Sequence, residues 1–316
     1  MISPTCQHSD RAKHGKDRNG HQRYKCRKCS VTFVSNEARP LGDMRISMDD
    51  AVMVLKMLLE GMSIRACERI TGTKRDTICS LVLHVGENCD RFLEANVKGV
   101  QANYIEMDEI WGFVGCKEKH KKANNLGDDL GDSWTWLAID AESKMVLAHH
   151  VGQRDDYSCR KFLKRVNGAS VGRCQVTSDG LRAYTYNVPF EMGSRASFAQ
   201  LIKNYQSSQS ETRYSPATIT SIEKKPVFGN PDKDHISTSY SERLNLSVRM
   251  HVRRFTRLTN AHSKSAKHHE AMVAIFVAWY NFCRKHETVK STPAVAAGLA
   301  GHKWSIKDLL TEAANG

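Results

Sequence analysis

Residues Tyr104–Gly115 read YIEMDEIWGFVG, a β-prone stretch about as long as one strand. Alternation along a strand places Asp108 on one face with Glu106, and Glu109 on the opposite face. A carboxylate inside a central strand is costly to bury unless a cation meets it. We therefore expect this strand to lie inside a sheet, with Asp108 facing a bound cation.

Two further acid-centred stretches lie downstream, TSDGLRAY around Asp179 and SYSERLNLSVR around Glu242. Asp179 follows the strand that we expect over Val171–Thr177. Glu242 lies near the start of a helix that Ser239 or Ser241 caps. The three acids are therefore expected on a strand, just beyond a second strand, and on a later helix.

The segment between these acids predicts how the sheet is built. SWTWLAIDAESKMVLAHHVG reads as a hairpin that turns over Asp140–Lys144, and Asp155 or Asp156 caps the helix that follows. The order strand, strand, strand, helix, strand is that of the ribonuclease H-like fold, with three antiparallel strands and then a parallel one. The predicted class is α/β with a mixed sheet. Phe198–Tyr205 is expected to add a strand, and residues 207–238 to form a long loop.

Composition points to a polyanionic partner. The chain has 316 residues, a net charge of +13 and a pI near 9.3, which favours nucleic acid over a basic enzyme with a solvated positive face. Its ten cysteines are scattered, as in a reducing cytosol. The polar N-terminus predicts no signal peptide, and no window approaches 18 apolar residues, so we expect no membrane span.

Residues 1–40 read as a small zinc-stapled module. Cys26-x-x-Cys29 forms one clear pair of ligands, whereas Cys6 is followed by Ser9 at the position that would close a second pair. His8 or His14 is the expected fourth ligand; the alternative is a degenerate ribbon without metal. The module is rich in Lys and Arg, and the residues expected to contact DNA are Arg23, Lys25, Arg27 and Lys28.

Residues 41–98 predict three helices. Ser47 caps the first, Gly61 ends it, Gly72 ends the second and Thr73 caps the third. A short helix, a glycine turn and a helix with a polar start are typical of a helix-turn-helix that reads a major groove; the alternative is a helical linker bundle. The DNA-contacting residues would be Lys74, Arg75 and Thr77.

Asp108, Asp179 and Glu242 are the residue types that two-metal phosphoryl transfer needs. Carboxylates hold two Mg²⁺ ions about 4 Å apart, one ion activating the attacking oxygen and the other stabilising the leaving oxygen. We expect Asp108 to bridge both ions, Asp179 to hold one and Glu242 the other. Glu109 is expected to be a buried or paired acid, and Glu106 to lie outside the coordination shell.

The helix that carries Glu242 is strongly basic. Residues 240–290 hold ten Lys or Arg against three Asp or Glu. A solvated basic face is the plain alternative to phosphate contact. The residues expected to contact DNA from this region are Asn245, Arg249, Arg253, Arg254 and Arg257.

Several motifs resemble those of the transposases of the bacterial insertion sequence one family. In chain order they are QRYKCRKC near the N-terminus, MDEIWGFVG, TSDGLRAY, SERLNLSVRMHVRRFTRLTNA and YNFCRKH. The resemblance covers nearly the whole chain. It implies a DDE-type recombinase with a ribonuclease H-like core that uses Mg²⁺ or Mn²⁺ at terminal inverted repeats. It carries over to Asp108, Asp179 and Glu242, and to Cys6, Cys26 and Cys29 with Zn²⁺.

The predicted function is therefore a DNA transposase, acting on double-stranded terminal repeats and target DNA as a homodimer or larger oligomer in the bacterial cytoplasm, near the nucleoid. Two alternatives are a DNA-binding regulator with an inactive nuclease-like domain and a structure-specific ribonuclease H-like nuclease. The predicted domains are 1–40 (ribbon), 41–98 (helix-turn-helix), 99–290 (catalytic) and 291–316 (tail).

Overall fold

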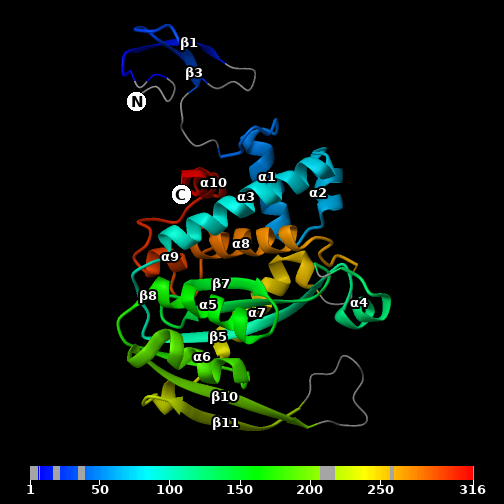
Figure 1. Cartoon of the computed structure of the whole chain (residues 1–316), viewed down its shortest axis with the longest axis vertical. Helices are drawn as coiled ribbons and strands as arrows, with labels where there is room; N and C mark the ends of the chain where they lie inside the picture. The colour runs from blue at the N-terminus through cyan, green and yellow to red at the C-terminus, as the bar shows by residue number, and fades with distance from the viewer. Residues whose placement is uncertain are drawn as a thin grey trace.

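The computed structural model describes residues 6, 8–16, 22–34, 40–127, 129–206, 218–256 and 260–315. A six-stranded mixed sheet lies in the lower half of Figure 1, with helices packed against it. In spatial order its strands are β11 (Thr218–Phe228), β10 (Ala196–Gln206), β9 (Cys174–Ser178), β5 (Tyr104–Val114), β6 (Gly131–Asp140) and β7 (Val146–Gly152).

Strand directions follow the predicted order. β5, β6 and β7 pair antiparallel, and β9 pairs parallel with β5 after the helix α5 (Asp156–Ala169). β10 then pairs parallel with β9. The predicted α/β class and mixed sheet are therefore confirmed, with the Tyr104–Gly115 stretch supplying the inner strand β5.

The prediction of one long loop over residues 207–238 was wrong. Residues 218–228 form β11, which pairs antiparallel with β10, whereas residues 207–217 lie outside the described part. The sequence TITSIEKKPVF is polar and contains Pro226, which is unfavourable in a central strand but is accepted at a sheet edge. β11 is such an edge strand, so burial leaves only a weak pattern in its sequence.

The three helices predicted before the sheet are confirmed as α1 (Met48–Leu59), α2 (Ile64–Thr71) and α3 (Arg75–Asn96). The Ser47 side chain accepts a hydrogen bond from the Asp50 N–H, and Gly72 ends α2 with a left-handed φ of 73°. Thr73 was wrongly expected to cap α3. The N-cap position is Lys74, which makes no side-chain cap, and the Arg75 N–H donates to Glu68 Oε1 instead (2.8 Å).

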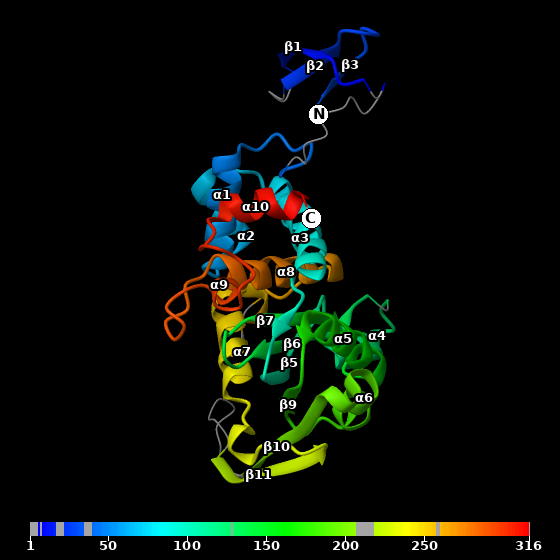
Figure 2. The same cartoon turned by 90° about the vertical axis from the view of Figure 1, so that its left-hand side faces the viewer.

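Helix α3 joins the N-terminal helices to the rest of the molecule. It packs along α8 (Ala266–Phe282) so closely that a Cβ on Gly86 would lie 2.4 Å from the Cβ of Ala271. The C-terminal α10 (Ile306–Asn315) covers α3 and α1 with buried leucines. Figure 2 shows α3, α8 and α10 stacked above the sheet. The segment beyond residue 290 is thus part of one shared core.

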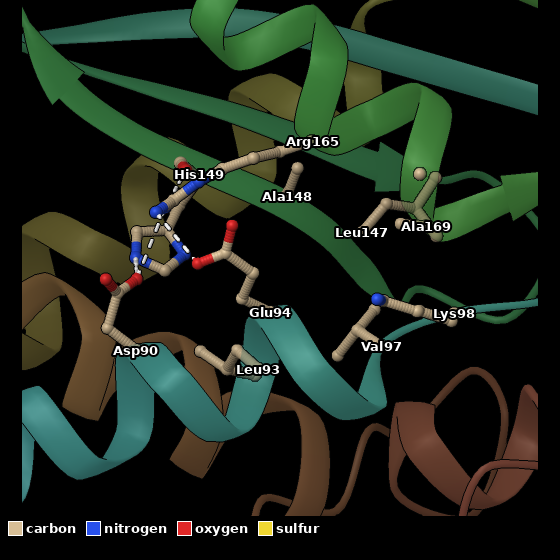
Figure 3. A pocket seen from close by; sticks show the side chains of 11 residues that line it. Asp90, Leu93, Glu94, Val97, Lys98, Leu147, Ala148, His149, Arg165 and Ala169 are labelled. Atoms are coloured by element: carbon tan, nitrogen blue, oxygen red, sulfur yellow. Dashed lines mark hydrogen bonds and ion pairs between the residues drawn. The ribbon is translucent and has the colours of Figure 1, made fainter.

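A polar network also ties α3 to the sheet (Figure 3). Arg165 of α5 and His149 of β7 each lie 3.2 Å from an oxygen of Asp90 on α3. Burial alone would raise the pKa of Asp90, but these two partners together hold it well below its usual range. The network borders a small pocket of about 150 Å³ and connects α3 to both α5 and β7.

The remaining elements are short or peripheral. A separate antiparallel sheet near the N-terminus contains β1 (Arg11–Lys16), β2 (Gln22–Cys26) and β3 (Thr32–Val34). The others are β4 (Val100–Gln101), β8 (Ser170–Val171), α4 (Glu118–Asn124), α6 (Arg182–Met192), α7 (Ser239–His251), α9 (Pro293–Ala296), η1 (Gly193–Arg195), η2 (Lys233–His235) and η3 (Arg253–Phe255). Among the described residues, no helix combines the length and apolar character needed to cross a membrane.

Helix α7 is attached to β5 through its first turn. The buried carboxylate of Glu106 accepts hydrogen bonds from the backbone N–H groups of Tyr240 (2.7 Å) and Ser241 (3.0 Å) through Oε2. The first N–H groups of a helix have no partner within the helix, and the helix dipole favours a negative charge there. Glu106 thus caps α7 from a strand more than 130 residues away.

We expect Glu106→Ala to lower the free energy of unfolding by about 2 kcal/mol, because two N–H groups of α7 lose their buried acceptor. Glu106→Gln keeps an acceptor oxygen and should lose less than half as much. Guanidinium denaturation of both variants measures the difference. Equal stability of Glu106→Ala and the wild type would contradict this account of how α7 is held.

Candidate active site and metal sites

Asp108 and Asp179 meet where the parallel pairing of β5 and β9 stops. The two strands pair over Tyr104–Met107 and Gln175–Ser178, so each acid is the next residue along its strand. Both strands run in the same direction, but β9 ends at Ser178 whereas β5 continues to Val114 beside β6. Asp179 therefore leaves the sheet next to the middle of β5, where Asp108 lies. One carboxylate oxygen from each of Asp108, Glu109 and Asp179 lies within 4.8 Å of the others.

Glu242 lies on helix α7, which packs against β5. One turn further along, the amide of Asn245 donates to Asp108 Oδ2 (2.8 Å), so this face of α7 lies against Asp108. The Glu242 carboxylate acts electrostatically on Asp108 but lies outside the 4.8 Å group. The hydroxyl of Thr238 (2.6 Å) and the ammonium of Lys203 hold its Oε1. Asp108 and Asp179 therefore lie together, and Glu242 lies outside that group on the helix that packs against β5.

Burial and crowding of negative charge change the acidity of the site. Burial, followed by the charges of Asp179 and Glu242, raises the pKa of Asp108 to about 7. Burial and Asp179 likewise raise the pKa of Glu109 to about 8. These shifts mean that the carboxylates repel one another, and a bound cation would relieve the repulsion.

The donor set suits a hard divalent cation. It is made of carboxylate oxygens, which Mg²⁺ and Mn²⁺ prefer, and contains no sulfur or imidazole. In addition, Asn245 Oδ1 is buried and has no hydrogen-bond partner among the described residues. An acceptor oxygen in that state beside Asp108 is what a cation or its bound water would satisfy.

Arg154, like Lys203, is a residue of the site that the sequence analysis missed. Its Nε donates to Glu109 Oε2 and its Nη2 to Asp179 Oδ2, both at 3.2 Å, while its guanidinium stacks over Trp134. It therefore connects the two faces of β5 and holds Asp179 in place. The only signal in the sequence is an arginine directly before a helix cap, and that pattern is too common to single it out.

Glu109 is buried and paired, as predicted. It lies on the face of β5 opposite Asp108, where the Tyr184 hydroxyl of α6 donates to Oε1 and Arg154 donates to Oε2. Its environment is therefore that of a structural anchor between the sheet and α6. Glu106 caps α7, which agrees with its expected place outside the coordination shell.

A second candidate metal site lies in the N-terminal sheet. Ligand atoms of Cys6, His8, Cys26 and Cys29 lie within 4.8 Å of one another, and Cys26 Sγ is 3.5 Å from His8 Nδ1. Three sulfurs and one imidazole nitrogen suit tetrahedral Zn²⁺. Of the two histidines that the sequence left open, the cluster contains His8, whereas His14 is exposed on β1.

The residues expected to contact DNA differ in their surroundings. In the N-terminal sheet, Lys25 and Lys28 are exposed, Arg27 pairs with Asp10 (3.8 Å), and Arg23 donates to Thr32. At the start of α3, Lys74 and Arg75 are exposed and Thr77 is half-buried.

The basic residues at and beyond α7 are mostly engaged within the fold. Arg249 donates to the backbone oxygen of Phe255 (3.2 Å). Arg254 donates to the backbone oxygen of His268, and burial lowers its pKa to about 10. Arg253 is exposed, whereas Arg257 lies outside the described residues.

Comparisons with known proteins show which family this part of the chain resembles. Residues 103–209, which contain Asp108 and Asp179, match the family model described as IS1 transposase. The chain is 25% identical over 177 residues to the insertion element iso-IS1n protein InsB of Shigella dysenteriae, covering 56% of this chain and 95% of that protein. A piggyBac transposase synaptic complex with hairpin DNA aligns over 84% of this chain and 70% of its own, at 10% identity and a TM-score of 0.38, too low to define a shared fold. The family match over residues 103–209 and the similarity to InsB together support an insertion sequence one family transposase.

Proposed function

We propose that this transposase binds the terminal inverted repeats of an insertion sequence and both cuts and joins DNA strands at a DDE site made of Asp108, Asp179 and Glu242. The observation that supports the proposal is the meeting of Asp108 and Asp179, whose carboxylate oxygens lie within 4.8 Å of each other. Glu242, on α7, is near enough to act on the charge of Asp108. The strand order β7-β6-β5-β9-β10 supports a ribonuclease H-like core over residues 99–290.

The three carboxylates would hold two Mg²⁺ or Mn²⁺ ions, which would supply Lewis acidity and neutralise the charge of the reacting phosphate. Around them, Asn245 orients Asp108, Arg154 orients Asp179, and Lys203 orients Glu242. The protein thus fixes where the phosphate sits, because each acid has its own partner. Fixed positions lower the reorganisation needed in the transition state.

The N-terminal modules would recognise the element ends. Zn²⁺ held by Cys6, His8, Cys26 and Cys29 would stabilise the fold of the ribbon over residues 1–40. Within residues 41–98, the turn at Gly72 and the exposed Lys74 and Arg75 at the start of α3 support a helix-turn-helix. Two element ends must be brought together, so we propose a homodimer or larger oligomer, working in the bacterial cytoplasm.

The decisive experiment uses labelled element ends with Mg²⁺. We expect Asp108→Ala, Asp179→Ala and Glu242→Ala each to lower cleavage and strand transfer by about three orders of magnitude or more, because each removes a ligand of the reacting centre. Glu312→Ala, an exposed acid on α10, is the matched control and should keep full activity.

The products also separate the competing functions. A regulator would bind the ends and leave them uncut in the wild type. A structure-specific nuclease would cut the ends but form no joined product. Undiminished cleavage by Asp108→Ala would contradict the proposed site.

The raised pKa of Asp108 predicts how the metal-free protein depends on pH. Between about pH 4, where a free Asp titrates, and about pH 7, the folded protein holds a proton on Asp108 that the unfolded chain has lost. The free energy of unfolding should therefore fall as pH rises across this window and level off above it. Denaturation at several pH values, without added divalent metal, should show a shallower slope for Asp108→Asn.

The affinity for a divalent metal should depend on whether Asp108 carries its proton. Because the proton on Asp108 competes with Mg²⁺, affinity measured by calorimetry should weaken as pH falls below about 7. An affinity that does not change between pH 6 and pH 8 would contradict a ligand with this raised pKa.

The two histidines of the N-terminal module provide a test of the zinc site. We expect His8→Ala to lose bound zinc, because it removes one of four ligands, while His14→Ala keeps about one Zn²⁺ per chain. Elemental analysis of the purified variants measures the metal. Zinc lost from His14→Ala but kept by His8→Ala would overturn the assignment.

A further inference from the structure

Helices α5 and α6 carry three exposed aromatic rings that the proposed site does not use. Tyr157 on α5 is 67% exposed, and Tyr186 and Phe190 on α6 are 65% and 69% exposed. No other large hydrophobic side chain in the described part of the chain is as exposed. Rings in this state leave apolar area in water unless a partner covers them.

Each ring is accompanied by a cation from the same two helices. The pairs are Lys161 Nζ over Tyr157 (4.4 Å from the ring centroid), Arg160 Cζ over Phe190 (4.4 Å) and Arg182 Cζ near Tyr186 (5.9 Å). Lys161 and Arg182 stand on long flexible side chains, so they can leave their rings without disturbing the fold, whereas Arg160 is also held by an ion pair with Glu191 (3.2 Å). We call these six residues the α5–α6 face.

The spacing of residues along α6 and the contacts between α5 and α6 indicate that the α5–α6 face is one continuous surface. Arg182, Tyr186 and Phe190 recur every four residues and therefore share one side of α6. The two helices are joined by a hydrogen bond from Asn187 to Asp156 (3.1 Å) and by the Arg160–Glu191 ion pair. The rings are thus held on rigid elements.

The α5–α6 face begins at the candidate active site. Helix α5 starts two residues after Arg154, which contacts Asp179, and α6 starts three residues after Asp179 itself. Figure 1 shows α5 and α6 beside the sheet, near β5. The starts of α5 and α6 are therefore connected by two or three residues to Arg154 and Asp179 of the candidate site.

We propose that the α5–α6 face binds a single-stranded segment of DNA next to the reacting phosphate, with unpaired bases stacking on Tyr157, Tyr186 and Phe190; this rests on the proposed function. Exposed aromatic rings next to cations are typical of sites that bind single-stranded nucleic acid. Each base can stack on a ring, and each nucleotide carries a phosphate that a cation can contact. Lys161 and Arg182 leave their rings as bases stack on them and then contact the phosphates, while Arg160 stays paired with Glu191 beside Phe190. A duplex hides the faces of its bases, so it cannot use the rings.

A second copy of the chain is a poorer occupant for this face. Its three cations would repel the same face of another molecule in a symmetric contact. The net charge of +13 adds to that repulsion. Charge complementarity therefore favours an anionic strand.

The test uses full-length protein without added Mg²⁺ and two fluorescein-labelled probes, a 20-nucleotide single strand and a blunt duplex of equal length. Tyr186→Leu/Phe190→Leu keeps apolar bulk but removes two flat rings. We expect the single strand to bind at least about tenfold more weakly to this variant, measured by anisotropy, with duplex binding within about twofold of wild type. Tyr186→Phe should retain single-strand binding, and Ile222→Ala, 56% exposed on β11, is the matched control.

Undiminished single-strand binding by the double-leucine variant would overturn the inference. So would a variant that becomes monomeric while its DNA binding stays the same, since the face would then join two copies. The two proposals fail separately, because undiminished cleavage by Asp108→Ala contradicts the active site and leaves the single-strand result to be judged by itself.

Discussion

The contact between the Glu106 carboxylate and the first turn of α7 determines where the third acid of the site lies. Glu106 stands on β5 two residues before Asp108, and it accepts the N–H groups of Tyr240 and Ser241 directly before Glu242. One carboxylate therefore fixes the start of α7 relative to the strand that carries Asp108. The three acidic residues of β5 have different roles. Glu106 accepts hydrogen bonds from the start of α7, Asp108 faces the candidate site, and Glu109 accepts a hydrogen bond from Tyr184 of α6.

Burial and the neighbouring negative charges make ionisation of the acids unfavourable. Each acid has a hydrogen-bond or ion-pair partner that partly offsets this cost. Asn245 donates to Asp108, Arg154 bridges Asp179 and Glu109, and Lys203 holds Glu242. The pKa of Asp108 nevertheless stays raised, because burial outweighs the hydrogen bonds. If the site binds a cation as proposed, its side chains are already in place and the cation would balance their charge.

Much of the fold could be predicted from local pattern. Alternation in YIEMDEIWGFVG, caps such as Ser47 and the turn at Gly72 are short-range signals, and they identified the inner strand and the N-terminal helices. β11 was missed because an edge strand buries too little to show alternation. Arg154 and Lys203 were missed because an ion pair formed across the fold leaves no periodicity. The choice of His8 over His14 likewise needed three-dimensional proximity to the cysteines.

The close packing of α3 on α8 has a mechanical consequence. Helix α3 is one rod of 22 residues, about 33 Å long, whose polar start faces solvent while its middle is locked against the core at Gly86. A helix held in this way cannot swing on a hinge. If the start of α3 contacts DNA bases as proposed, the protein sets the distance from those bases to the phosphate that is cut. The length of α3 would then determine how far from the recognised bases the cut is made.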